Sequence, residues 1–259
     1  MIYVMLPAFN EEKGIGAVLD KLSDIEARLP EKFRIVVVDD GSRDRTSEIV
    51  SSYGHRMDIR LFRFDRNRGV SEVFKTGLSF VVQNSANPDH DVCVVLDSDN
   101  TQDPALILTM AERVRQGADI VIASRFEGEG RMIGCPWLRQ MFSFVVSWLM
   151  RTIVRLPGVK DYSTFYRAYR VRVLKEGFEA YGDNLLAGQG FAAIGAFLIR
   201  LGNLTQKIEE IPFILRYDLK QGASGIKLFK TIRGYFELMC DCVKTQNYRK
   251  VMRRAAVSR

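Results

Sequence analysis

The chain has 259 residues, a length that suits one large α/β domain or a domain with an appendage. Hydrophobic residues make up 47% and charged residues 27%, which is the composition of an ordinary globular protein. The four cysteines form no Cys-x-x-Cys motif and the two histidines are too few for a zinc cluster, so a structural zinc site is excluded.

The net charge of +7 is concentrated in one segment. Residues 125–175 contain ten Lys or Arg against three acids, while the rest of the chain balances at 28 of each. We therefore expect this segment to face nucleic acid, a phospholipid surface or a phosphorylated substrate. A solvated basic surface is the alternative.

The thiols and the N-terminus bear on the cellular compartment. Cys93 lies in an apolar run and the other cysteines are scattered, so we expect reduced thiols and a cytosolic protein. The chain enters an apolar run at once, without a basic stretch before it, so we expect no signal peptide.

The first half of the chain alternates between short apolar runs and segments with helical periodicity. Strands are predicted at residues 2–6, 33–38, 59–64, 92–96 and 120–123. Helices are predicted at residues 15–25, 46–53, 70–78 and 104–116, the last with Pro104 in its first turn. This alternation predicts an α/β fold with βαβ units and a mainly parallel, Rossmann-like sheet flanked by helices.

The pattern changes after residue 125. The Gly- and Glu-rich residues 126–134 are expected to form a mobile loop. Residues 141–150 are an apolar run between two arginines, and they are too few for a membrane span, which needs about 20 residues. We expect a helix that lies on a membrane surface or packs in a core or oligomer interface. The remaining predictions are a helix at 191–199, a strand at 208–215, a helix at 227–250 and a basic tail at 251–259, disordered or close to anionic lipid.

Two carboxylates, Asp97 and Asp99, directly follow the fourth predicted strand. Open α/β sheets bind ligands at that end of their strands. Acids one residue apart repel each other unless a cation lies between them, and a divalent cation that also bridges a diphosphate fits this pattern. An acidic turn without a ligand is the alternative.

Four ordered motifs at the ends of predicted strands carry a family resemblance. They are Leu6-Pro7-Ala8-Phe9-Asn10-Glu11-Glu12, Val38-Asp39-Asp40-Gly41-Ser42 with Asp44 and Thr46, Asn67-x-Gly69 with Gly77, and Asp97-x-Asp99 before Asp103-Pro104. Together they resemble the family 2 glycosyltransferases, which have the GT-A fold, and they cover about the first half of the chain. No Gly-x-Gly-x-x-Gly follows the first strand, which argues against a dinucleotide-dependent dehydrogenase.

The resemblance implies the donor side of a site. Asp40 is implied to bind the nucleotide base. The opposite side of the nucleotide would be lined by Pro7, Ala8, Asn10 and Glu11. Acids at positions 11 and 12 also suit the first turn of a helix, so a purely structural role is the alternative for them.

The resemblance also implies a metal. Asp97 and Asp99 would hold Mg²⁺ or Mn²⁺ against the donor diphosphate, and the cation would neutralise the leaving group. In relatives a Gln two residues after the second Asp can join the metal. That position is Thr101 here, and Gln102, one residue further, is the candidate ligand.

The second half resembles the dolichol-phosphate mannosyltransferases and their bacterial polyprenyl-phosphate relatives. Those enzymes place an Arg after the fifth strand and then an Arg and a Ser four apart on an amphipathic helix, which Arg125, Arg139 and Ser143 match. The resemblance implies that these residues hold the phosphate of the acceptor lipid, for which the guanidinium fork is suited.

Two further segments resemble this group less closely. Residues 161–167 resemble its Asp-x-x-Ser-Gly-Phe-Arg motif, with Thr164 in place of Gly. Arg216, with Gly222, Ser224 and Lys227, resembles its Arg-x-x-Gly-x-Ser-Lys motif at a longer spacing, so Arg216 is the better candidate. Neither Trp lies in Gln-x-x-Arg-Trp, so the processive polysaccharide synthases do not fit.

The resemblance leads us to expect a metal-dependent, inverting hexosyltransferase. The donor would be GDP-mannose or, next, UDP-glucose, and the acceptor a polyprenyl phosphate at the cytosolic face of an anionic membrane, with a membrane subunit as a candidate partner. The expected catalytic residues are Asp97, Asp99, Arg125, Arg139, Ser143 and Arg216. Residues 1–125 would bind the nucleotide sugar and residues 126–250 the acceptor, within one globular unit that ends in the tail 251–259.

Two other functions fit parts of the sequence. Transfer to a saccharide or protein hydroxyl would need a general base, for which Asp161, Asp183 and Glu209 are the nearest carboxylates, whereas a phosphate acceptor is already ionised. A non-catalytic basic scaffold for lipid or nucleic acid is the alternative of another class. The intact Asp97 and Asp99 argue against a scaffold, and the lack of aromatic-plus-basic RNA motifs argues against nucleic acid.

Overall fold

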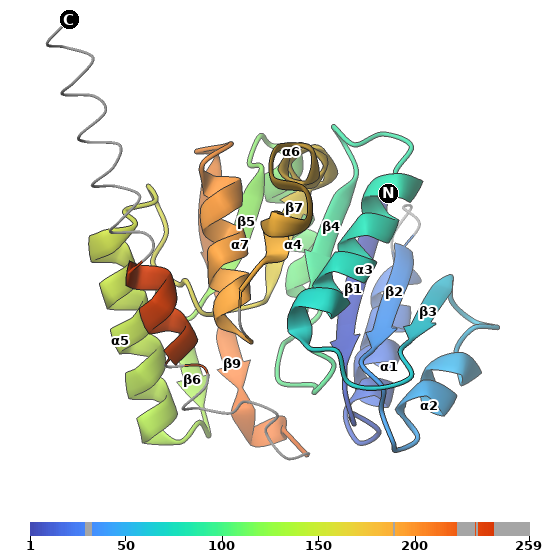
Figure 1. Ribbon diagram of the computed structural model, residues 1–259. Helices are drawn as coiled ribbons and strands as arrows, with labels where there is room; N and C mark the ends of the chain where they lie inside the picture. Colours follow the sequence, from blue (N-terminus) through green and yellow to red (C-terminus); the bar gives the residue numbers. More distant parts are fainter. Residues whose placement is uncertain (29–32, 189, 222–230, 232, 241–259) are drawn as a thin grey trace, which may run out of the picture.

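The computed structural model describes residues 1–28, 33–188, 190–221, 231 and 233–240. Within these residues the centre of the fold is a seven-stranded sheet with the order β3-β2-β1-β4-β7-β5-β8 (Figure 1). Its strands are β1 Ile2–Ala8, β2 Phe33–Asp39, β3 Ile59–Arg63, β4 Val92–Val95, β5 Ile120–Ser124, β7 Arg167–Arg170 and β8 Ile208–Pro212. A small second sheet pairs β6 Arg131–Ile133 with β9 Ile214–Arg216.

Helices cover both faces of the large sheet. They are α1 Ile15–Glu26, α2 Thr46–Ser52, α3 Val70–Asn84, α4 Leu106–Arg115, α5 Trp137–Ile153, α6 Val171–Tyr181 and α7 Ala192–Gly202, with short 3-10 turns η1 Gly182–Leu186 and η2 Tyr217–Leu219. The expected α/β architecture with a mainly parallel sheet is therefore confirmed.

The alternation of side chains along β1 divides the core into two layers. Tyr3 and Met5 point to one face, where they pack with apolar residues of α3, α6 and α7. Val4 and Leu6 point to the other face, toward α1, α2 and α4. Because both faces are covered, the central strands are almost wholly apolar and buried, which is why they appeared in the sequence as continuous apolar runs.

Strand β7 is antiparallel and lies between β4 and β5, where Ala168 pairs with both Val94 and Val121. The sequence analysis assigned no strand here, because Arg167 and Arg170 bracket only two apolar residues. The Arg167 side chain is fully buried and donates to the carbonyls of Tyr162 and Ile194. A buried arginine that binds main-chain carbonyls is invisible to a search for apolar periodicity.

A single strand was predicted over residues 208–215, but the structure has two strands there, β8 and β9. The chain leaves the large sheet at Phe213, so that β8 pairs with β5 and β9 pairs with β6. The amide of Phe213 donates to Ser124 and its carbonyl accepts from Arg131, which joins the two sheets. The prediction of a loop over residues 126–134 was correspondingly wrong for residues 131–133, which form β6.

Helix α6 was also not anticipated. Residues 231 and 233–240 are helical, as expected for part of the predicted helix 227–250. The rest of that helix, the tail 251–259, and the motif positions Gly222, Ser224 and Lys227 lie outside the described residues. Among the described cysteines, Cys93, Cys135 and Cys240 form no disulfide. No helix in the described part of the chain combines the length and the apolarity that a bilayer crossing requires.

Candidate active site

The loops that follow β1, β2 and β4 meet at the carboxyl edge of the sheet. The Ser98 hydroxyl donates to the carbonyl of Pro7 (2.8 Å), and the amide of Asn10 donates to Ser42 Oγ (2.9 Å). A Cβ atom at Gly14 would lie 2.9 Å from the Cα of Asp99, so only glycine lets the loop after β1 come this close to the Asp-x-Asp turn. The structure thus brings together the motifs that the sequence placed at separate strand ends.

Asp97 is fixed by Gln102 on the same loop. The Asp97 amide donates to Gln102 Oε1 (2.9 Å), and Gln102 Nε2 donates to Asp97 Oδ2 (2.7 Å). Gln102 is buried, so this pair sets the orientation of the Asp97 carboxylate. Gln102 therefore contacts the predicted metal-binding carboxylate directly and holds it through its amide group.

The two oxygens of Asp99 have different partners. Oδ1 accepts hydrogen bonds from the amide (3.1 Å) and the hydroxyl (2.6 Å) of Thr101. Oδ2 forms a close ion pair with Lys220 Nζ, 121 positions away along the chain. Both members of this pair are largely shielded, with 11% of the Lys220 side chain and 13% of the Asp99 side chain exposed. The sequence analysis did not identify Lys220.

Negative charge is crowded around this turn. Burial, followed by the nearby Asp99 carboxylate, raises the pKa of Asp97 to about 7. Burial also raises the pKa of Glu11 to about 7; the Lys220 ammonium opposes this shift, and Asp99 and Asp97 add to it. Three acids therefore share one lysine, an arrangement that favours the uptake of further positive charge.

These residues fit the Mg²⁺ or Mn²⁺ ion that the Asp-x-Asp motif implies. No group of three or more His, Cys, Asp or Glu side chains in the described residues forms a ready-made metal cage. Mg²⁺ in nucleotide-dependent enzymes is usually held by only one or two carboxylates, with substrate phosphates and water as the other ligands. Asp97 and Asp99 are two neighbouring carboxylates that repel each other, and they match a site in which the protein supplies one or two ligands.

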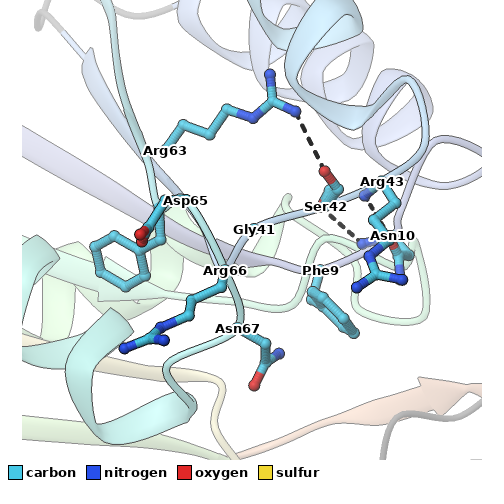
Figure 2. Close-up of a pocket in the computed structure, with 10 residues that line it drawn as sticks. Phe9, Asn10, Gly41, Ser42, Arg43, Arg63, Asp65, Arg66 and Asn67 are labelled. Atoms are coloured by element: carbon cyan, nitrogen blue, oxygen red, sulfur yellow. Dashed lines mark hydrogen bonds between the residues drawn. The ribbon is translucent and has the colours of Figure 1, made fainter.

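A cavity of about 600 Å³ adjoins the loops after β1, β2 and β3 (Figure 2). Its volume lies within the usual range of small-molecule sites. The lining residues are Phe9, Asn10, Gly41, Ser42, Arg43, Arg63, Phe64, Asp65, Arg66 and Asn67. Of the residues predicted to line the nucleotide site, Asn10 lies here, while Glu11 lies in the acid cluster around Asp99. Sequence reasoning missed the arginines, because arginines on loops also occur on ordinary solvated surfaces.

Asp40 holds two of these loops together. Its carboxylate accepts the amides of Arg68 (2.6 Å) and Gly69 (3.0 Å), and burial raises its pKa in spite of these bonds. The next residue, Gly41, has φ of +77°, and a Cβ atom there would lie 2.5 Å from the Arg66 backbone. Asp40 and Gly41 therefore hold the loop after β2 against the loop after β3, and both loops line the cavity.

Arg125 follows β5, as predicted, and forms a buried ion pair. Its guanidinium donates to both oxygens of Asp161 at 2.8 Å and to the Ser163 hydroxyl at 2.6 Å. The positive charges of Lys220, Arg139 and Arg125 all lower the pKa of Asp97 against the effect of burial. Arg125 therefore lies near the acid cluster, and the family-like 161–167 segment holds it in place.

Arg139 and Ser143 lie on α5. The Arg139 guanidinium donates to the Tyr217 hydroxyl (2.7 Å) and lies over the Tyr217 ring, 5.1 Å from its centroid. Ser143 is buried beside it on the inner face of the helix. The Arg216 side chain is 46% exposed and is paired with Asp218, whereas its backbone amide donates to the carbonyl of Thr101 beside the Asp-x-Asp turn.

None of the three carboxylates considered as a general base is placed like one. Asp183 pairs with Lys75 and Glu209 with Arg113, both on exposed surface. Asp161 is fully buried, and the hydrogen-bonded Arg125 outweighs burial and lowers its pKa. An acid with a lowered pKa that is already bound to a guanidinium is a poor proton acceptor.

Two known glycosyltransferases resemble this chain in sequence. A dolichol-phosphate mannosyltransferase of Pyrococcus furiosus is 27% identical over 241 residues, which are 92% of this chain and 63% of that protein. The chain therefore spans less than two thirds of that relative's length. An undecaprenyl-phosphate mannosyltransferase of Micrococcus luteus is 26% identical over 212 residues, which are 82% of each protein.

A solved structure supports the fold. Glucosyl-3-phosphoglycerate synthase from Mycobacterium tuberculosis, in complex with Mn²⁺, uridine diphosphate and phosphoglyceric acid, superposes with a TM-score of 0.66 at 18% identity, over 93% of this chain and 78% of that one. At this identity the likeness concerns the fold alone, which is GT-A. The family described as glycosyl transferase family 2 matches residues 3–178, more than half of the chain, so this protein belongs to the family 2 glycosyltransferases.

Proposed function

We propose that this enzyme transfers a hexose from a nucleotide sugar to a polyprenyl phosphate, with inversion and with the help of Mg²⁺ or Mn²⁺. GDP-mannose is the first choice of donor and UDP-glucose the second. The proposal is supported by relatives that act on dolichyl or undecaprenyl phosphate. The observation that carries it is the position of two cationic groups, Arg125 and Arg139, close enough to Asp97 to affect its pKa, with none of the candidate bases free.

The donor would lie across the Asp-x-Asp turn, with its nucleoside toward the cavity in Figure 2. When bound, the cation neutralises negative charge on the departing diphosphate. Gln102 orients Asp97, and Thr101 orients Asp99, before any ligand arrives. Such preorganised charge adds no reorganisation cost at the moment of reaction.

The acceptor phosphate would bind between Arg139 and Ser143, with Arg125 behind them. A phosphate monoester has a second pKa of about 6, so its oxygen is already anionic at neutral pH and needs no proton acceptor. It needs positioning and partial charge neutralisation, which a guanidinium supplies well. This reading explains why Asp161, the buried carboxylate nearest to Arg125, is bound to that arginine rather than left free.

A lipid acceptor requires access to a membrane, and α5 offers a suitable face. Its exposed large apolar side chains are Trp137, Leu138, Met141, Phe144, Val145 and Trp148. Its opposite face, which includes Ser143 and Met150, is buried against the protein. We propose that α5 lies in the headgroup region of the cytosolic leaflet, with Arg151 and Arg155 toward anionic lipid. A membrane subunit as a further partner remains part of this proposal.

The proposal is tested by an acceptor panel. The purified protein is incubated with radiolabelled GDP-mannose or UDP-glucose and with a short polyprenyl phosphate, the matching uncharged polyprenol, or free saccharides. We expect label on the polyprenyl phosphate alone. Label on the polyprenol or on a saccharide would instead support the hydroxyl-acceptor alternative, and no transfer from any donor would support the scaffold.

A matched pair of variants sharpens this test. Arg139→Ala should raise the KM for polyprenyl phosphate while nucleotide-sugar binding stays nearly unchanged. Arg113→Ala removes the same charge from an exposed ion pair on α4 and should have a much smaller effect. Equal effects of the two substitutions would mean that Arg139 acts through general surface charge, and its assignment to the acceptor phosphate would fail.

A further inference from the structure

Among the described residues, Lys220 forms the ion pair with the Asp-x-Asp motif, while Lys21 contacts the same turn through the side chain of Asn100. The Lys220 ammonium forms an ion pair with Asp99 Oδ2 and also lowers the pKa values of Asp97 and Glu11. Asp99 Oδ1 is already held by Thr101. Oδ2 is therefore the oxygen of Asp99 that a divalent cation would take, and Lys220 is bound to it.

The segment that carries Lys220 is attached on both sides of the site. The Arg216 amide donates to the carbonyl of Thr101 (2.9 Å), so the segment lies directly on the Asp-x-Asp loop. Tyr217 binds the Arg139 guanidinium on α5. The Lys220 amide closes the turn onto the carbonyl of Tyr217 (3.2 Å). The ammonium is thus delivered to Asp99 by a short, well-anchored turn.

The charges around Lys220 show why it can be released. Glu11, Asp97 and Asp99 place three carboxyl groups around the Lys220 ammonium, and Asp99 is the one that pairs with it directly. A divalent cation would bring more positive charge to Asp99 than the ammonium does. A divalent cation bound to Asp99 would deprive the Lys220 ammonium of its closest partner. The diphosphate of a donor held by that cation would then bring new anionic oxygens near the ammonium.

We propose that Lys220 is a displaceable counter-ion: it occupies Asp99 until a divalent cation binds, and it then binds the diphosphate of the donor. This inference rests on the proposed use of a metal and a nucleotide diphosphate. It adds a residue that competes with the metal in the donor-free protein and assists the donor afterwards. Replacement of Lys220 should therefore strengthen the binding of a divalent cation and weaken the binding of a nucleoside diphosphate.

The experiment measures both equilibria without an acceptor. The metal-free full-length chain is titrated with Mn²⁺, and the electron paramagnetic resonance signal of free Mn²⁺ reports binding. GDP and UDP are then titrated at saturating Mn²⁺. The variant is Lys220→Gln, and the control is Lys75→Gln, which removes the same charge from an exposed pair with Asp183.

Lys220→Gln should bind Mn²⁺ about tenfold or more tightly than the wild type, the size expected when one competing charged hydrogen bond is removed. It should bind the preferred nucleoside diphosphate more weakly. Lys75→Gln should match the wild type in both titrations. In an Asp99→Asn background the effect of Lys220→Gln on Mn²⁺ should be much smaller, because the direct ion pair between the two residues is already lost.

An unchanged or weaker Mn²⁺ affinity of Lys220→Gln would overturn the proposal, as would a full effect in the Asp99→Asn background. If Lys220→Gln does not fold, Lys220→Met, which keeps most of the length of the side chain, replaces it. Both titrations omit the lipid. Failure of the acceptor panel would therefore reject the proposed function and leave this inference standing, and the reverse holds as well.

Discussion

Asp161 holds both a charged side chain and part of its own loop in place. It binds both ends of the Arg125 guanidinium, and its Oδ1 also accepts the amides of Ser163 and Thr164 at 3.0 and 3.1 Å. Neither charged side chain is more than 9% exposed. The ion pair is therefore a structural clamp on the loop beside the acid cluster, whatever Arg125 does during the reaction.

We expect Asp161→Asn to lower the free energy of unfolding by about 3–5 kcal/mol, since it leaves a buried guanidinium without its counter-charge. Urea denaturation at pH 7 measures the loss. Asp183→Asn, in an exposed pair, serves as the control and should be close to the wild type. Because Arg125 lowers the pKa of Asp161, the stability that it contributes is present above the unfolded pKa of about 3.9 and is lost as the pH falls through the lower folded value.

Glu11 should give the free energy of unfolding a pH dependence opposite to that of Asp161. Its folded pKa of about 7 lies above the ordinary glutamate value of 4.5, so between these values the folded protein binds a proton that the unfolded chain has lost. The free energy of unfolding of the metal-free protein should therefore fall as the pH rises through this window. Glu11→Gln should make that fall less steep. Denaturation curves at pH 5, 6 and 7 test this, and identical slopes for the two proteins would contradict it.

The site could be predicted from the sequence wherever a residue lies in a local pattern. Asp97, Asp99 and Arg125 follow the apolar strands β4 and β5, which run in the same direction because each is antiparallel to β7 between them, so these residues reach the same edge of the sheet. Lys220, and the pairing of Asp161 with Arg125, could not be found in this way. Their contacts span 121 and 36 positions, and the three-dimensional path of the chain decides them, rather than any periodicity.

At the scale of elements, α5 combines two functions on one helix. Its inner face places Arg139 and Ser143 beside the site, and its outer face is a row of exposed aromatic and aliphatic side chains. The sequence showed an apolar run with arginines at its ends, and it left a membrane surface and a core or oligomer interface as alternatives. Exposed tryptophans favour the surface role, since their amphipathic rings prefer the interface between lipid and water.

We expect the protein to co-sediment with anionic vesicles and to do so less well with neutral ones. Binding should weaken as salt rises, because charges farther apart than about 8 Å are largely screened at physiological ionic strength. Trp148→Glu should reduce binding strongly, while Leu204→Glu, another exposed apolar position, should not. Binding that ignores both salt and lipid charge would contradict the electrostatic part of this prediction.

The strands that escaped prediction share one property: their strand-forming residues are few or are mixed with charge. Strand β7 has arginine at both ends, and β6 and β9 have three residues each. Long strands that are buried on both faces gave continuous apolar runs and were found with nearly correct bounds, as β1 and β2 show. Short strands depend on partners that are distant in sequence, and single-segment patterns do not contain that information.

For the molecule as a whole, metal removal is the decisive perturbation. We expect EDTA to abolish transfer by the wild type and added Mg²⁺ or Mn²⁺ to restore it, because the diphosphate leaving group then regains its neutralising charge. Asp99→Ala should be inactive but folded, as judged by circular dichroism, and Asp183→Ala should remain active. Full turnover in EDTA would show that this enzyme works without a divalent cation.

The antiparallel strand β7 also sets the order in which the chain can fold. Strands β3, β2, β1 and β4 can pair as soon as the first 95 residues are available. Strand β5 cannot join them, because its neighbours are β7 and β8, which come after residue 166. On the ribosome, β5 and the Arg125 that follows it must therefore wait for β7 to emerge. The part of the sheet built from residues 1–125 is completed only by β7 and β8 from the second half of the chain, so the two halves are synthesised in succession but become native together.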